Sequence, residues 1–418
     1  MGVSNKRSLR NPALYIIHHG ARYLFPLIVT PYLARKFGPA NFADFVIWNA
    51  CVWTASLFME YGFMFSAVKA TAQSATKDQL ERTLSKIVSA KLVLLPLAII
   101  VYGILTTFAG ITARHPAAAC VGIIAVISYG GSFAWYFQGQ ERAATAVVVE
   151  ALPQIVQFCL IFLLVHDADD VWLAALLQSL AALGTIVIAT RLIKRDRLAW
   201  RLAFDGVRDA IRAATPIFVE RLCLTVYQNA TPLIIAAFSV REQVAYYNVG
   251  DKFLQFLGGL SIPLTYAFLP AISKRLSSNK PDWKLSIRVV SLVTAATCAL
   301  ALISFLGARF IILLLFRPEY AAAIPIARCF CIAACLVSYN TCIANFILVP
   351  VGRARILIVT STTALILSLS SQVILLPRFG ALGSAVSRSI AEVGVAIILS
   401  VVASRLMSGR ARKTGAPD

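Results

Sequence analysis

Charged side chains are scarce in this chain. Only 14% of its 418 residues are Asp, Glu, Lys or Arg, while 59% are hydrophobic; a soluble protein carries roughly 25% charged residues. This shortage excludes a water-soluble globular protein, because too few polar groups exist to cover its surface. Apolar runs of about twenty residues, the length at which a helix crosses a bilayer, fill most of the chain. Because they lack the alternating pattern of barrel strands, the sequence predicts an all-α integral membrane protein.

Motifs for catalysis and metal binding are also missing. The sequence has no phosphate-binding loop, nucleophile motif or zinc-ligand cluster. No loop is long enough to hold a soluble domain. The nine cysteines lie in or beside apolar runs without zinc-site spacing, so we interpret them as packing residues. We therefore predict a protein that is not an enzyme and that has no cofactor and no metal.

The apolar runs predict twelve transmembrane helices in two six-helix lobes. We expect an N-terminal lobe over 1–192, a basic amphipathic cytoplasmic linker over 193–212, a C-terminal lobe over 213–406 and a cytoplasmic tail over 407–418. The predicted helices are 14–34, 45–67, 87–108, 117–137, 144–165, 172–192, 213–238, 244–269, 287–305, 321–349, 356–376 and 381–406.

The positive charge of the chain predicts its orientation. The formal net charge is +20, but the basic residues sit in short loops between apolar runs, which argues against nucleic acid as a partner. With cytoplasmic termini, the inner segments hold 25 Lys and Arg and the outer loops hold seven. Positive loops stay on the cytoplasmic side, so we predict that both termini are cytoplasmic.

The linker carries seven basic and three acidic residues between Arg191 and Arg212. We expect it to form a helix on the membrane surface, with Phe204, Val207 and Ile211 facing the lipid.

The two halves share a weak internal repeat. Thr30-Pro31 matches Thr231-Pro232 at an offset of 201, and Ser128-Tyr129 matches Ser338-Tyr339 at an offset of 210. Six helices per half give both halves the same orientation. The repeat therefore predicts an axis along the membrane normal with a cavity between the lobes.

Several stretches resemble the bacterial O-antigen and polysaccharide flippases of the multidrug/oligosaccharidyl-lipid/polysaccharide exporter superfamily. The resemblance covers about residues 14–395. It rests on the segments 30–39 (Thr-Pro-Tyr-Leu-Ala-Arg-Lys-Phe-Gly-Pro), 60–63 (Glu-Tyr-Gly-Phe), 135–139 (Trp-Tyr-Phe-Gln-Gly), 246–252, 269–273 and 378–385.

This resemblance implies a bacterial inner-membrane transporter that works by alternating access. It implies a cargo of undecaprenyl-diphosphate-linked oligosaccharide, meaning repeat units of O-antigen, capsule or exopolysaccharide. The implied partners are that lipid-linked glycan and the phospholipid bilayer, together with polysaccharide polymerase and chain-length proteins.

Charged residues inside the predicted spans are the candidate site, because a charge at a helix centre costs about 2.5–3.5 kcal/mol to insert. Arg22 and Arg221 each lie eight residues into the first helix of their lobe. Two guanidinium groups facing one cavity would suit a diphosphate. The alternatives are pairing of Arg221 with Glu220 and of Arg22 with Glu60.

Further charged residues complete the prediction. Lys252 and Arg388 are additional candidates for substrate binding, and Asp251 and Glu392 are their candidate charge partners. Arg388 and Glu392 lie four residues apart on one helical face, where a structural pair is expected. His18 lies one turn from Arg22 and is a candidate for proton coupling.

Other basic residues lie close to helix ends. Lys91, Arg288 and Arg328 are expected to extend their side chains to the membrane interface rather than to bind cargo.

Other functions remain open from the sequence. A cation-coupled drug exporter of the same superfamily should have a cavity rich in carboxylates, whereas the deep basic residues here favour an anionic cargo. A membrane glycosyltransferase or oligosaccharide polymerase should carry a sizeable catalytic outer loop. A peptidoglycan-precursor flippase typically has two more helices than the twelve predicted.

Overall fold

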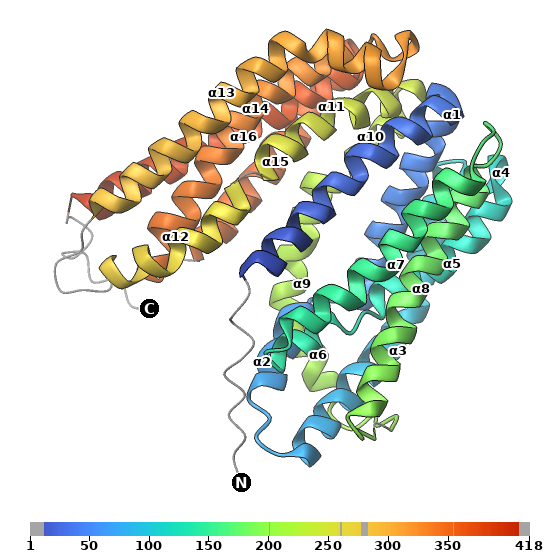
Figure 1. Ribbon diagram of the computed structural model, residues 1–418, viewed down its shortest axis with the longest axis vertical. Helices are drawn as coiled ribbons and strands as arrows, with labels where there is room; N and C mark the ends of the chain where they lie inside the picture. Colours follow the sequence, from blue (N-terminus) through green and yellow to red (C-terminus); the bar gives the residue numbers. More distant parts are fainter. Residues whose placement is uncertain (1–11, 200, 260, 277–282, 354, 409–418) are drawn as a thin grey trace. The chain divides into compact units, whose positions relative to one another are not determined.

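The computed structural model describes residues 12–199, 201–259, 261–276, 283–353 and 355–408 (Figure 1). Side chains are described from Leu27 onward, apart from 143, 261–267, 270 and 355. These residues form helices joined by short turns and no β-strand, which confirms the predicted all-α class. They fall into two compact units, Met1–Ala237 and Phe238–Asp418.

Unit 1 is built from ten helical segments. Their bounds are α1 Pro12–Glu60, α2 Phe63–Ala72, α3 Lys77–Phe108, α4 Ile111–Arg114, α5 Pro116–Gly130, α6 Ala134–Gly139, α7 Ala143–Leu164, α8 Val171–Arg195, α9 Val207–Asn229 and α10 Thr231–Phe238. Helix α1 packs on α3, α5 and α7, while α8 packs on α5 and α7.

Unit 2 is centred on one helix, α14, which contacts α11, α13 and α16. Its bounds are α11 Glu242–Gly259, α12 Ser261–Leu276, α13 Trp283–Phe316, η2 Pro318–Tyr320, α14 Ala323–Ile343, η3 Ala344–Leu348, η4 Val349–Val351, α15 Arg355–Phe379 and α16 Ala381–Met407. The segment η3 is a π-helical continuation of α14.

Nine helical segments within the described residues are long and apolar enough to cross a membrane. One of them, Leu27–Ala72, has 46 residues and contains Gly38 with φ 70° and ψ 172°. Only glycine adopts that backbone conformation readily, so Gly38 bends α1 between the ranges predicted for the first two helices. Helical segments also cover the predicted 213–238 and 244–269, but they are not among the nine. The count of twelve stays a prediction.

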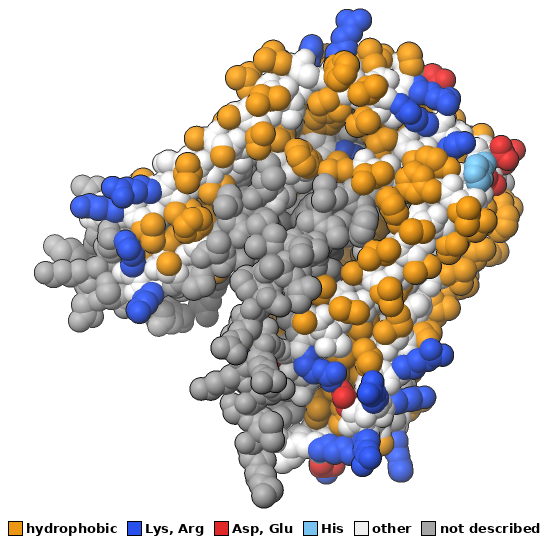
Figure 2. Space-filling model, viewed as in Figure 1, with side chains coloured by type: hydrophobic (Ala, Val, Ile, Leu, Met, Phe, Trp, Pro, Cys, Tyr) orange, Lys and Arg blue, Asp and Glu red, His pale blue; other side chains and the backbone are white. Residues whose placement is uncertain are grey.

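The surfaces of both units suit a lipid environment. Figure 2 shows hydrophobic side chains along the helices and Lys and Arg near the helix ends. On α3, Leu97, Ile100 and Ile104 are exposed, and on α13 Leu302 and Leu306 are exposed. In water such continuous apolar exposure would be costly, whereas in hydrocarbon it is neutral.

The segment predicted as a surface helix has a different structure. Helix α8 continues to Arg195, and α9 begins at Val207. Between them, the backbone N–H groups of Ala199, Arg201 and Ala203 donate hydrogen bonds to Glu81, Ser85 and Ser89 of α3. These acceptors lie at four-residue spacing on one face of α3, so the chain follows that helix.

The three residues expected to face lipid from this segment do not behave alike. Phe204 is exposed as expected, whereas Val207 is buried in the core of unit 1. The expectation of one amphipathic helix over 193–212 is therefore wrong. Its role as the boundary between the two predicted lobes stays a prediction.

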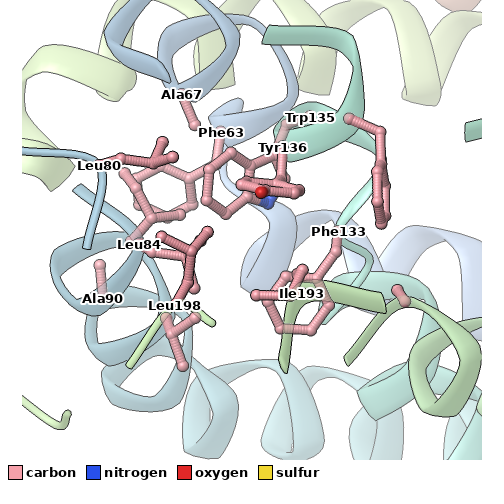
Figure 3. Close-up of a cluster of buried hydrophobic side chains, with 14 of the residues drawn as sticks. Phe63, Ala67, Leu80, Leu84, Ala90, Phe133, Trp135, Tyr136, Ile193 and Leu198 are labelled. Carbon is pink, nitrogen blue, oxygen red and sulfur yellow. The ribbon is translucent and has the colours of Figure 1, made fainter. Parts of the chain in front are cut away.

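A cluster of buried side chains holds α2, α3, α6 and α8 of unit 1 together (Figure 3). Phe63 of α2 and Leu84 of α3 are fully buried, and so are Phe137 of α6 and Ile193 of α8. The short α6 supplies mainly aromatic side chains, whose large apolar area stabilises this region. Members of the cluster border both helix interruptions that position the candidate site, Phe63 at the first and Phe133 at the second.

Candidate functional site

The helix that carries Glu60 is interrupted immediately after it. Tyr61 and Gly62 have φ of 48° and 77°, so α1 ends and α2 begins at Phe63. The Glu60 carboxylate accepts hydrogen bonds from the backbone N–H of Gly62 at 3.0 Å and of Met64 at 2.6 Å. A negative group at a helix N-terminus satisfies free donors and opposes the helix dipole. Glu60 therefore stabilises the interruption in the second predicted span.

Lys91 lies beside a second interruption. Its Nζ donates to the carbonyl oxygens of Gly130 at 2.9 Å and Ser132 at 2.8 Å, where α5 stops before α6. The side chain is only 4% exposed. The expectation that Lys91 extends to the interface is wrong. Carbonyl groups freed by the broken helix bind it instead.

Helix α9 packs directly on the first interruption. The ring of Phe218 stacks on Tyr61 with centroids 4.1 Å apart. A Cβ at Gly62 would lie 2.9 Å from Ile217 Cγ2 and 3.0 Å from the Phe218 nitrogen. Only glycine permits this approach, so the left-handed residue serves both the turn and the packing of α9.

Arg221 lies one turn further along α9, half-buried, with its guanidinium carbon 5.6 Å from the ring centroid of Phe65. Its Nε is buried and has no hydrogen-bond partner in the described part of the chain. Across those same residues, no ion pair joins Arg221 to Glu220. The alternative interpretation, a local pair with Glu220, is therefore not what this structure contains.

Glu60, Lys91 and Arg221 each lie at or beside one of the two helix interruptions of unit 1, and we call these three residues the helix-break site. They come from α1, α3 and α9 within unit 1, and their two positive charges exceed one negative charge. Lys91 and Glu60 are engaged by backbone groups, whereas the Arg221 guanidinium lies over the exposed ring of Phe65. A planar fork of donors in such a place can bind phosphate oxygens in a bidentate manner.

The other predicted site residues are distributed elsewhere. The side chains of Arg22 and His18 lie outside the described residues. In unit 2, Asp251 accepts a hydrogen bond from Gln255 Nε2 at 2.6 Å, and Lys252 donates to Gln255 Oε1 at 3.4 Å. Both are half-buried. The two adjacent charges are therefore bridged by one amide.

Glu392 has a partner that the sequence did not predict. Asn340 Nδ2 of α14 donates to Glu392 Oε2 at 2.9 Å and to the Glu392 carbonyl oxygen at 3.1 Å. The carboxylate is 8% exposed. Arg388 is half-buried one turn away on α16, and its predicted pairing with Glu392 stays a prediction.

One buried carboxylate was missed by the sequence interpretation. Asp44 is completely buried and binds Arg114 Nε and His115 Nε2, each at 3.1 Å. It directly precedes the predicted span 45–67, so it is not among the charges predicted to lie inside the spans. The signal available in the sequence was that Asp44 borders one predicted span while Arg114 and His115 border another.

Known proteins resemble this chain in sequence and in fold. The sequence model of a family described as polysaccharide biosynthesis protein matches residues 8–276. A protein of Shigella dysenteriae that carries the provisional name O-antigen transporter is 25% identical over 394 residues, 93% of this chain and 98% of that protein. A protein of Escherichia coli strain K12 with the same provisional name is 27% identical over 329 residues, 77% of this chain and 79% of that protein.

Solved structures show the same fold. A structure described as the lipid II flippase MurJ in an inward closed conformation has a TM-score of 0.73 at 13% identity, over 93% of this chain and 87% of that one. An inward-facing multidrug resistance transporter of the MATE family has a TM-score of 0.68 at 13% identity, over 97% of this chain and 100% of that one. The chain therefore has the fold seen in these two transporters.

Proposed function

Because the chain belongs to the polysaccharide biosynthesis protein family, we propose that it translocates a lipid-linked oligosaccharide across the bacterial inner membrane. The cargo is an undecaprenyl-diphosphate-linked repeat unit of O-antigen, capsule or exopolysaccharide. It passes from the cytoplasmic to the periplasmic leaflet by alternating access. The relatives carry the names of transporters and flippases, in agreement with a protein that is not an enzyme.

The placement of Arg221 carries this proposal. A guanidinium in a membrane-spanning protein is costly unless it binds a partner or faces water. Arg221 has a buried Nε without a hydrogen-bond partner among the described residues, and it lies over an exposed aromatic ring. A diphosphate supplies the acceptor oxygens that these donors lack. Arg22 is the second proposed diphosphate ligand, and Lys252 and Arg388 are proposed to contribute from unit 2.

The proposed direction of transport agrees with simple electrostatics. With the cell interior negative, moving one negative charge outward releases about 2.3 kcal/mol per 100 mV. A diphosphate cargo can therefore move outward on the membrane potential. Cytoplasmic termini, and polysaccharide polymerase and chain-length proteins as partners, belong to the same proposal.

Replacement of Arg221 by alanine tests the proposal. We expect Arg221→Ala to reduce surface polysaccharide at least tenfold while lipid-linked repeat units accumulate in the cytoplasmic leaflet. Arg212→Ala is the matched control, because Arg212 is exposed on the same helix, and it should leave polysaccharide unchanged. Immunoblots of membrane fractions check that each variant is present. Wild-type polysaccharide in both Arg22→Ala and Arg221→Ala cells would contradict the site assignment.

A drug exporter of the same superfamily is the alternative function. A cationic drug binds a carboxylate inside the membrane, and two of the predicted candidates are already occupied: Glu60 accepts from two backbone N–H groups and Glu392 accepts from Asn340. Deletion of the gene should therefore leave susceptibility to cationic drugs unchanged. Increased susceptibility together with normal surface polysaccharide would favour the exporter.

A further inference from the structure

Four polar or aromatic side chains of unit 1 form a group that the helix-break site does not use. Gln178 Nε2 of α8 donates to Asn49 Oδ1 of α1 at 2.5 Å and to Tyr129 Oη of α5 at 3.4 Å. Trp53, one turn after Asn49 on α1, stacks on Tyr129 with ring centroids 4.4 Å apart and 27° between planes. We call these four residues the aromatic–amide cluster.

The location of Trp53 is unusual for a membrane protein. It lies about two helical turns or more inside the predicted span 45–67, although Trp is normally enriched at the two membrane interfaces. It is nevertheless 45% exposed. One face of its indole covers Tyr129, and nearly half of the residue remains accessible. Two amide side chains at the same level would be costly against lipid, so this surface is suited to a polar ligand.

The amides retain unused hydrogen-bonding capacity. Among the described residues, the Asn49 Nδ2 group and the Gln178 Oε1 atom make no hydrogen bond. An amide carries two donors and an acceptor with two lone pairs. If both amide groups were flipped, so that their N and O atoms exchanged places, Asn49 would present an acceptor and Gln178 a donor. The cluster therefore offers both kinds of group beside an exposed aromatic side chain.

The cluster is confined to one unit. At the repeat offset of 201, Asn49 and Trp53 correspond to Gly250 and Leu254, and at the offset of 210 Gln178 corresponds to Arg388. A Cβ at Gly250 would lie 2.5 Å from Ile326 Cγ2, and Leu254 is buried. Unit 2 therefore uses these positions for helix packing and for a cation. A structural clamp common to both repeats would not require this difference.

We infer that the aromatic–amide cluster is a subsite for a sugar ring of the lipid-linked glycan. A pyranose ring has an apolar C–H face and an equator of hydroxyl groups. The face stacks on the exposed indole of Trp53, and the hydroxyls donate to Gln178 Oε1 and accept from Asn49 Nδ2. This inference rests on the proposed function, because a sugar must be part of the cargo. It assigns glycan binding to the aromatic–amide cluster and diphosphate binding to Arg221, two separate positions in unit 1.

The test compares two lipids that differ only in the sugar. The full-length protein in nanodiscs is titrated with undecaprenyl diphosphate and with undecaprenyl diphosphate bearing one N-acetylglucosamine. We expect Trp53→Ala to weaken binding of the sugar-bearing lipid about tenfold and to leave binding of the bare lipid unchanged. Gln178→Leu should do the same to a smaller extent. Trp172→Ala is the matched control, since Trp172 is 43% exposed on α8 outside the cluster, and it should change neither affinity.

Two further variants distinguish the loss of a sugar contact from misfolding of the protein. Trp53→Phe retains an aromatic face, so it should lose only part of the preference for the sugar-bearing lipid. Asn49→Leu should lose the hydroxyl contact while the stack remains. The inference is overturned if Trp53→Ala weakens both lipids equally, as a purely structural clamp predicts, or if it weakens neither.

The outcomes separate the inference from the proposed function. If the wild-type protein binds neither lipid, the proposed cargo is wrong. If it binds both equally well and Arg221→Ala weakens both, the diphosphate site stands and the sugar subsite does not. A preference of the wild-type protein for the sugar-bearing lipid that disappears in Trp53→Ala supports both.

Discussion

The same short motif precedes a helix interruption in each unit, but the two interruptions differ. In unit 1, Ser128-Tyr129 is followed by the end of α5 at Gly130, and α6 restarts at Ala134. In unit 2, Ser338-Tyr339 is followed by the π-helical segment Ala344–Leu348. The helix of unit 1 is interrupted completely, whereas the helix of unit 2 continues in a π-helical conformation. Repeated sequence therefore marks where each span deviates and leaves open how.

The two units also differ in the side chain that contacts this region. Helices α3 and α13 start 206 positions apart, so Lys91 corresponds to Thr297. Lys91 binds two carbonyl groups freed by the break, whereas Thr297 Oγ1 contacts Ser338 Oγ at 3.0 Å. An ammonium can satisfy several carbonyls at once, which makes a full break tolerable in an apolar medium. Unit 1 thus uses a buried charge where unit 2 uses a neutral hydroxyl pair.

Removal of the Lys91 ammonium should have the largest effect on this comparison. Lys91→Met leaves two buried carbonyls without their donor, and we expect it to lower the stability by about 3 kcal/mol. Thr297→Val in unit 2 removes one hydroxyl pair and should cost about 1 kcal/mol. The apparent Tm of each variant in detergent measures the difference. Equal Tm shifts in the two variants would show that the charge has no special role.

Asp44 provides the next test, because the position corresponding to it at the offset of 201 is Ala245, which is buried. Asp44→Ala makes unit 1 resemble unit 2 here and removes a buried acceptor of Arg114 and His115. We expect a loss of about 2 kcal/mol. Asp78→Ala, which breaks an exposed pair with Arg82, is the control and should not change the Tm measurably. A similar Tm for both variants would refute a stabilising role for Asp44.

Two glycines with the same backbone conformation isolate the effect of α9 packing. Gly62 has φ 77° and ψ 9°, and Gly352 of unit 2 has φ 74° and ψ 14°. Alanine should cost about 1 kcal/mol at either position for the left-handed conformation. Gly62→Ala should cost about 1 kcal/mol more, because its Cβ meets Ile217 and Phe218, while that of Gly352 meets nothing within 4 Å. Identical Tm shifts would mean that α9 does not pack tightly on the break.

The smallest effect is expected at Glu392. Its partner Asn340 donates a hydrogen bond and needs only an acceptor, which the amide of Glu392→Gln retains. We therefore expect less than a twofold change in surface polysaccharide. Asn340→Leu, which leaves a buried carboxylate without this donor, should reduce it more. Complete loss of polysaccharide in Glu392→Gln cells would instead identify Glu392 as a group that must ionise during transport.

Much of the fold followed from local patterns. Apolar runs located the helices because spanning segments must satisfy their own backbone hydrogen bonds. The predicted range 87–108 lies inside α3, and 381–406 nearly coincides with α16. The repeat singled out Ser128-Tyr129 and Ser338-Tyr339, and a helix interruption follows each of them. Hydropathy cannot predict a break inside an apolar run, so 45–67 and 117–137 were each expected to be a single helix.

The sequence by itself determined that this is a helical membrane protein with charges buried among apolar spans, since composition and run length leave no other solvent for it. It also identified Glu60 and Arg221 as charged residues inside predicted spans, where a charge without a partner is costly. Only the tertiary structure decided what each charge contacts: Lys91 binds freed carbonyls, Asp44 binds Arg114, and Asn49, Trp53, Tyr129 and Gln178 meet. The physical reason is that the cost of burying a charge depends on its depth in the membrane, which the sequence reveals. The groups that offset this cost come from other helices, and only the packing of the helices brings them together.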